Sequence, residues 1–91
     1  MSKWQKQLAA ARNNPKDIRL DQLLIILKGA GASVREGKGS HLVAFYPGTR
    51  LSQTIPRGSP ILPVYVRKVI DMIDEAEQLG VTTIDKPAEG E

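Results

Sequence analysis

The 91-residue sequence contains no cysteine and only one histidine. Without cysteine the chain can form neither a disulfide framework nor a thiolate zinc site, a composition that fits a reducing compartment. A single histidine also excludes the usual zinc ligand sets, which combine several histidine, cysteine or carboxylate ligands. We therefore expect a cytoplasmic protein that uses neither a metal nor another cofactor.

Long apolar segments are missing as well. The longest strongly apolar run, Leu23 to Leu27, is far shorter than the roughly 20 residues that cross a bilayer. No apolar stretch of the kind found in signal peptides follows the start of the chain. We expect no membrane partner, and the length allows one core and one domain, predicted over residues 1–80, with a flexible tail over 81–91.

Charge is distributed unevenly. Residues 1–70 contain 12 Lys or Arg and 3 Asp or Glu, a net charge of +9, whereas residues 71–91 contain one Lys and 7 acids, a net charge of −6. A body of this charge favours a polyanionic partner, because each phosphate that it neutralises releases counterions. The same charge also serves ordinary solubility.

Two helices are predicted in the first third of the chain. Trp4, Leu8 and Ala11 recur at helical spacing, which predicts an amphipathic helix over residues 3–12 with Trp4 in the core or as its lid. After an extended segment over 18–20, Asp21 is the expected N-cap of a second helix that runs through Gly29. The second helix buries four apolar residues and ends at two glycines expected to adopt positive φ. These residues are Leu23, Leu24, Ile26 and Leu27, and the glycines are Gly29 and Gly31.

The apolar period then changes from about 3.6 to 2, which indicates strands. Three short strands are predicted over residues 33–36, 40–46 and 51–55, joined by short turns as an antiparallel meander. A last helix is predicted from Pro63 to Gly80, since proline suits a first turn and glycine a C′ position. The order α-α-β-β-β-α predicts a two-layer α+β domain with the helices on one face of the sheet.

The segment Gly37-Lys38-Gly39-Ser40-His41 joins the first two strands and contains the only histidine. An imidazole titrates near neutral pH and can transfer a proton in either direction. The glycines allow the backbone to approach a phosphate closely, and Ser40 adds a hydroxyl and an N–H. RNA has its own nucleophile, the 2′-OH, so this segment is a candidate site for RNA cleavage with His41 as the catalytic group. A histidine that begins a strand and has no task is the plainer interpretation.

Cations near this segment are candidate ligands for the RNA backbone. Lys38, Arg35 and Arg57 can stabilise negative charge at the phosphate, provided that the strands bring Arg57 back toward the turn. Arg67 and Lys68 at the start of the last helix can contact RNA, and a solvated helix face explains them equally well. Composition leaves one histidine and no obvious partner acid, so the leaving oxygen would take its proton from Lys38, Tyr65, water or His41 itself.

Five short stretches follow one another in a recognisable order over residues 2–75. They are Ser2-Lys-Trp, Asn14-Pro-Lys-Asp-Ile-Arg-Leu-Asp-Gln-Leu, Lys38-Gly-Ser-His, Thr54-Ile-Pro and Tyr65-Val-Arg-Lys-Val-Ile. In this set the sequence resembles the HicA-type (YcfA-like) toxins of bacterial and archaeal toxin–antitoxin pairs. The resemblance implies a fold like a double-stranded-RNA-binding domain, metal-independent cleavage of mRNA with His41 as the catalytic residue, and a HicB-type antitoxin as partner. Many family members have a second histidine directly after the first, where this chain has Leu42.

Two other functions fit the same basic chain. A non-catalytic module could bind duplex RNA by its shape across the minor groove. An interaction protein could use its basic body to dock an acidic partner. Cleavage of RNA that depends on His41 separates the first hypothesis from both.

Overall fold

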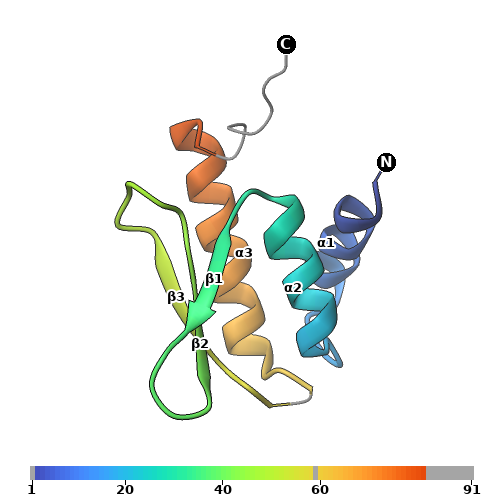
Figure 1. The fold of residues 1–91 in the computed structure, drawn as a ribbon. Coiled ribbons are helices and arrows are strands. Elements are labelled where there is room, and N and C mark those ends of the chain that lie inside the picture. Colours follow the sequence, from blue (N-terminus) through green and yellow to red (C-terminus); the bar gives the residue numbers. More distant parts are fainter. Residues whose placement is uncertain (1, 59, 82–91) are drawn as a thin grey trace.

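The computed structural model describes residues 2–58 and 60–81 (Figure 1). The helices are α1 (Lys3–Asn13), α2 (Leu20–Gly29) and α3 (Pro63–Leu79), and the strands are β1 (Ser33–Glu36), β2 (His41–Phe45) and β3 (Ser52–Pro56). The predicted order α-α-β-β-β-α and the α+β class are confirmed. Of the tail predicted over 81–91, all but the first residue lies outside the described residues.

The three strands form one antiparallel sheet in the order β1-β2-β3, with β2 in the middle. Val43 lies opposite Arg35 of β1 and Thr54 of β3. The alternate residues Leu42 and Ala44 are buried, and the helices lie on that side of the sheet (Figure 1). The predicted arrangement with the helices on one face is therefore confirmed.

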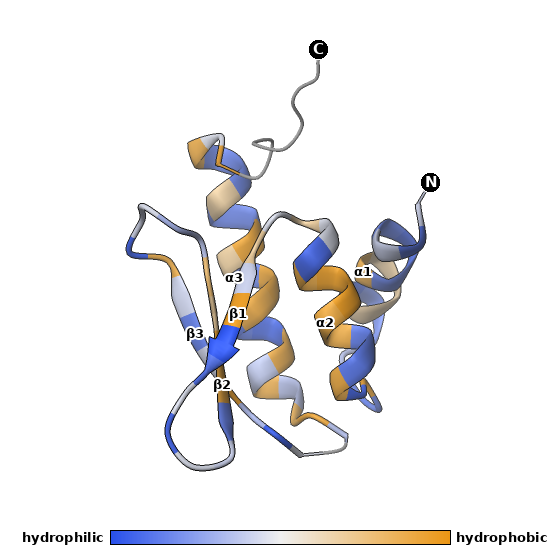
Figure 2. Cartoon of the chain, viewed as in Figure 1, coloured by the Kyte–Doolittle hydropathy of each residue, from blue (hydrophilic) through white to orange (hydrophobic). Residues whose placement is uncertain are grey.

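The core lies between the sheet and the helices. In Figure 2 apolar residues gather along α2 and on α3 where these helices lie beside the sheet. Ile18 and Ile61 add a short bridge in which the Ile61 N–H donates to the Ile18 carbonyl over 2.8 Å. This bridge ties the loop before α2 to the loop before α3, so both helices begin at the end of the sheet that contains the β1–β2 turn (Figure 1).

The start of α2 differs from the prediction. Asp21 is not the N-cap, because the helix begins at Leu20 and Arg19 occupies the N-cap position. The Arg19 backbone N–H donates to Gln22 Oε1 over 2.8 Å, so a side chain three residues onward satisfies this donor. Asp21 instead lies in the first turn, where a negative charge interacts favourably with the helix dipole.

The end of α2 also differs. Gly31 has the predicted positive φ of 90°, but Gly29 is the last helical residue and has no positive φ. Its role is tertiary, because a Cβ at this position would lie 2.5 Å from the Cβ of Trp4 and closer still to the indole ring. Trp4 therefore packs against the core as predicted, and Gly29 provides the space for it.

The last helix begins and ends as the sequence predicts. Pro63 is its first residue, and Gly80 follows it with a left-handed φ of 79°. Asp74 in its acidic second half forms two hydrogen bonds with the guanidinium of Arg12 in α1, of 2.9 and 2.5 Å. These bonds lower the pKa of Asp74 and join α1 to α3. Within the part of the chain that is described, no helix combines the length and apolar character needed to cross a membrane.

Candidate functional site

The pleat of β2 divides its side chains between the two faces of the sheet. Leu42 and Ala44 point into the core, whereas His41, Val43 and Phe45 are exposed or half-buried and lie on the other face. We call this second face, which points away from the helices, the outer face. Among the described residues, the strand side chains of the outer face are exposed or half-buried.

The turn that delivers His41 is closed by backbone hydrogen bonds. The Gly37 N–H donates to the His41 carbonyl over 2.9 Å, and the His41 N–H donates to the Lys38 carbonyl over 3.2 Å. Gly39 has a φ of 62°, a backbone conformation that favours glycine. Gly39 and Ser40 are both exposed, so the predicted backbone approach to a phosphate is sterically open here.

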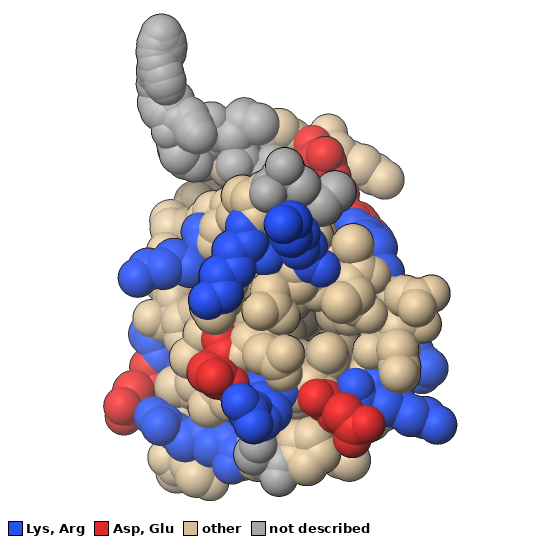
Figure 3. All heavy atoms as spheres, turned by 90° about the vertical axis from the view of Figure 1, so that its right-hand side faces the viewer, with Lys and Arg blue, Asp and Glu red and all other residues tan. Residues whose placement is uncertain are grey.

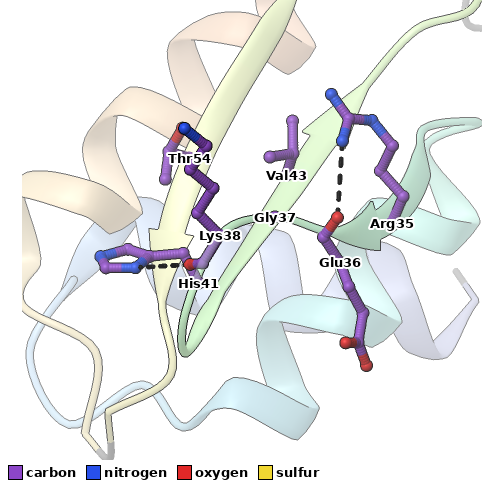
Figure 4. A pocket seen from close by; sticks show the side chains of 7 residues that line it. All are labelled: Arg35, Glu36, Gly37, Lys38, His41, Val43 and Thr54. Carbon is purple, nitrogen blue, oxygen red and sulfur yellow. Dashed lines mark hydrogen bonds between the residues drawn. The ribbon is translucent and has the colours of Figure 1, made fainter.

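A hollow of about 660 Å³ opens between this turn and the outer face (Figure 4). It brings together three of the residues that the sequence proposes for the site, namely His41, Lys38 and Arg35. Its complete lining is Arg35, Glu36, Gly37, Lys38, His41, Val43 and Thr54. Two cations and one imidazole therefore share one open surface.

The His41 ring has a defined orientation. Its Nδ1 lies 3.3 Å from the Lys38 carbonyl oxygen (Figure 4). A carbonyl only accepts hydrogen bonds, so this contact favours the tautomer with the proton on Nδ1 and leaves the lone pair on Nε2. In many catalytic sites a carboxylate fixes the histidine tautomer, and here a backbone carbonyl can do so.

Glu36 is directed away from His41. Its carboxylate points to the other side of the sheet in Figure 4, where Oε2 lies 3.0 Å from Nη2 of Arg57. The chain does return Arg57 to the turn, because its backbone N–H donates to the Ser40 carbonyl over 3.1 Å. Arg57, however, lines a second hollow, of about 620 Å³, between α2 and β1. The structure thus separates Arg57 from the hollow beside His41.

Arg67 and Lys68 line hollows other than the one beside His41. Arg67 lines a hollow beside the end of α1, together with Arg12. Lys68 lines another one between α3 and β3, together with Arg50. Neither residue lines the hollow beside His41, so the structure does not gather the predicted RNA ligands into one site.

Leu42 is only 6% exposed and faces the helices. A histidine at this position would point into the core, away from the imidazole of His41. Tyr65, one of the possible proton donors, packs against the core from α3 and does not line the hollow. The groups that remain near His41 for the leaving oxygen are Lys38 and water.

Three residues on the outer face were not among the predicted site residues. Thr54 and Val43 line the hollow, and Phe45 lies under Arg35, whose guanidinium carbon is 5.9 Å from the ring centroid. The signal for two of them was present in the sequence, because the period of 2 along β2 places Val43 and Phe45 on the same face as His41. Thr54 could not be found in this way, since its position depends on the register between β2 and β3.

The side of the molecule formed by α1 and α2 has mixed charge. Figure 3 shows the side formed by α1 and α2, where lysine and arginine side chains gather in the upper part and acidic groups lie among basic ones below. Within residues 2–58 and 60–81, no group of three or more histidine, aspartate and glutamate side chains is arranged to hold a metal ion. The hollow beside His41 is therefore a cationic surface without a metal-ligand cluster.

Comparison with known proteins adds no assignment: no protein-family model, curated protein or solved structure matched this chain. The class that the fold and the site define is a small α+β domain with an exposed histidine and two cations on an open sheet face.

Proposed function

We propose that this protein is an endoribonuclease that cleaves mRNA without a metal ion and uses His41 for proton transfer. The main observation that supports this proposal is the setting of the His41 side chain. His41 is exposed beside Lys38 and Arg35, and the Lys38 carbonyl orients its ring so that Nε2 is free to accept a proton.

The reaction begins with the substrate's own nucleophile. Nε2 of His41 removes the proton of the 2′-OH, and the 2′-oxygen attacks the adjacent phosphorus. The bond from phosphorus to the 5′-oxygen then breaks, leaving a 2′,3′-cyclic phosphate on one fragment and a 5′-hydroxyl on the other. The 5′-oxygen receives a proton from the imidazolium, from Lys38 or from water.

Two cations can stabilise the additional negative charge of this reaction. Lys38 and Arg35 both line the hollow beside His41, and an ammonium or guanidinium group stabilises a phosphorane most where water is partly excluded. Arg57 is held by Glu36 on the other side of the sheet. We therefore assign the contact with the cleaved phosphate to Lys38, while Arg35 contributes its positive charge to the same hollow.

The biological role we propose is that of the toxin in a toxin–antitoxin pair, with a HicB-type antitoxin as partner. The ordered sequence stretches that resemble HicA-type toxins support this role. The openness of the outer face is compatible with it, because a partner protein that covers the face would block access of RNA to His41.

The decisive experiment measures cleavage of single-stranded RNA by the wild type and by His41→Ala, with and without EDTA. We expect the variant to lose about 10²–10⁴-fold in rate, with an unchanged melting temperature because His41 is exposed. Equal rates for the two proteins would refute the assignment of His41, and loss of cleavage in EDTA would refute the metal-free mechanism.

A matched pair of lysines tests the phosphate contact. Lys38→Gln should weaken RNA binding and reduce the slope of log K against log salt by about 0.7, whereas Lys28→Gln on α2 should leave both unchanged. If the two variants behave alike, the RNA does not bind at the hollow. Tight binding of duplex RNA without any cleavage would favour the alternative of a non-catalytic double-stranded-RNA-binding module.

A further inference from the structure

The chain has only four aromatic residues, and the core uses three of them. Trp4 packs over Gly29, Tyr65 packs against the core, and Tyr46 is buried with its hydroxyl donating to the Ala30 carbonyl over 3.0 Å. Phe45 is the exception. It is half-buried on the outer face and does not belong to the core or to the side chains packed against it.

Phe45 lies on the same strand and the same face as His41. They are four positions apart in the sequence, which corresponds to about 13 Å along β2, and Val43 lies between them on this face. Arg35 connects the two ends, because it lines the hollow beside His41 and also places its guanidinium carbon 5.9 Å from the Phe45 ring centroid. A continuous strip of imidazole, apolar and aromatic surface results.

We propose that Phe45 and Arg35 form a base-stacking subsite for single-stranded RNA. The inference rests on the proposed function, because the RNA bound here is the substrate cleaved at His41. Unstacked bases are bound by aromatic rings and by the planes of arginine guanidinium groups, and both surfaces are present at this position. The subsite binds a base some distance from the cleaved phosphate.

The charge of the outer face supports this occupant. Strand alternation and register place one arginine and no acid among the residues that the three strands present on this face, and Glu36 is directed away from it. Lys38 adds a second cation at the turn. The strand residues of the face are Ser33, Arg35, His41, Val43, Phe45, Ser52, Thr54 and Pro56.

Single-stranded RNA fits this face better than a duplex. In an A-form helix the bases are stacked on one another, so their faces cannot reach an aromatic ring on a protein surface. A subsite made of Phe45 and Arg35 gains its stacking energy only from a base that has left such a stack. The proposed subsite therefore favours binding to flexible or single-stranded regions of RNA.

The test combines a protein variant with an RNA variant. The probe is a single-stranded 2′-O-methyl RNA of about 10 nucleotides, which lacks the 2′-OH nucleophile and therefore cannot be cleaved by the proposed mechanism. Wild type and Phe45→Leu are compared for binding to the intact probe and to probes with one abasic position each. Leucine keeps apolar volume at position 45 and removes the flat ring.

We expect Phe45→Leu to raise the Kd of the intact probe about tenfold, while Phe45→Tyr retains affinity. One abasic position should weaken binding to the wild type by a similar factor and should have no further effect on Phe45→Leu. Arg35→Lys, which keeps the charge but loses the planar group, should lose affinity as well. A merely structural role of Phe45 would not depend on which base is missing.

The subsite is refuted if no abasic position couples to Phe45→Leu, or if a duplex of equal length binds as tightly and is equally sensitive to this substitution. Failure of the proposed function gives a different result. If coupling is found but unmodified RNA is not cleaved, the subsite stands and the ribonuclease assignment falls. If cleavage depends on His41 but no coupling is found, the ribonuclease assignment stands and the subsite falls.

Discussion

Trp4 of α1 lies in the space that a side chain at position 29 of α2 would fill. Glycine in a helix interior costs about 0.5–1 kcal/mol relative to alanine, and this is an upper limit for Gly29, which is the last residue of α2. Glycine is required at this position because the indole of Trp4 occupies the room that a side chain would need. The contact between these two residues sets how closely the two N-terminal helices approach each other.

Gly29→Ala should therefore destabilise the protein, although the substitution favours helix formation. We expect a loss of about 1–3 kcal/mol from overpacking against Trp4, measured by urea unfolding. The matched control is the same substitution in a Trp4→Ala background, where the clash is absent and alanine should add up to about 1 kcal/mol. A stabilised Gly29→Ala single variant would contradict the observed packing.

The ion pair between Arg12 and Asp74 should make a pH-dependent contribution to stability. Hydrogen bonds from Arg12 lower the pKa of Asp74, so the contribution is complete above the unfolded-state pKa of about 4 and is lost as the pH falls through the lowered value. Both side chains are more than a third exposed, so solvent screening limits the expected coupling energy to about 1 kcal/mol at pH 7.

A double-mutant cycle with Arg12→Gln and Asp74→Asn measures this coupling at pH 7 and again at acid pH. The control pair is Arg19 and Asp21, which are 3.7 Å apart and more exposed, and whose coupling should be close to zero. Equal coupling energies for the two pairs would show that the bidentate geometry of the first has no energetic consequence.

Tyr46 should make the protein sensitive to alkali. Burial, and secondarily the charge of Glu77, raises the pKa of Tyr46 to about 12. Between pH 10 and 12 the unfolded chain has lost the phenolic proton that the folded protein still holds, so stability decreases as pH rises, by about 2–3 kcal/mol over this range. Tyr46→Phe should remove this component.

The same variant also loses the hydrogen bond to the Ala30 carbonyl, which should cost about 1 kcal/mol at pH 7. Unfolding free energies of the wild type and Tyr46→Phe, measured from pH 7 to pH 12, should therefore meet above pH 10 and then cross, so that the wild type is the less stable protein at pH 12. A constant difference across the range would contradict the raised pKa.

Under the proposed ribonuclease function, Leu42→His should not add a second histidine to the site beside His41. The position is buried on the helix side of the sheet, so an imidazole there loses apolar packing and is desolvated, at a cost of about 1–3 kcal/mol. We expect a lower melting temperature and no increase in the cleavage rate. Val43→His is the matched comparison, because that position lines the hollow with His41 and is not buried in the core. A faster Leu42→His enzyme would contradict this assignment of faces.

The sequence was sufficient for the order of elements, because that order follows from the change in the period of apolar residues. It also located the turn that presents His41. The errors at Asp21 and Gly29 have a common origin, since each position was interpreted from local preference. Gln22 in fact satisfies the N-terminal donor, and Trp4 determines the residue at position 29.

Which side chains share the site with His41 depends on the register in which the strands pair, and the sequence alone does not show that register. The sequence shows that Glu36 and Arg57 lie near the turn, but only the pleat of paired strands reveals that both side chains leave the face that contains His41. Arg67 and Lys68 are adjacent in sequence, and the helical turn between them directs each into a different hollow. The hydrogen bond that orients His41 depends on the conformation of the turn.

The alternation along β2 has a consequence for how such a protein can change over evolutionary time. Leu42 and Ala44 are fixed by packing, whereas Val43 and Phe45 do not belong to the core. Substitutions at positions 43 and 45 can therefore accumulate without loss of folding. Under the proposed function, a library restricted to positions 43, 45, 52 and 54 would change the contacts with RNA while the packed core that stabilises the fold stays unchanged.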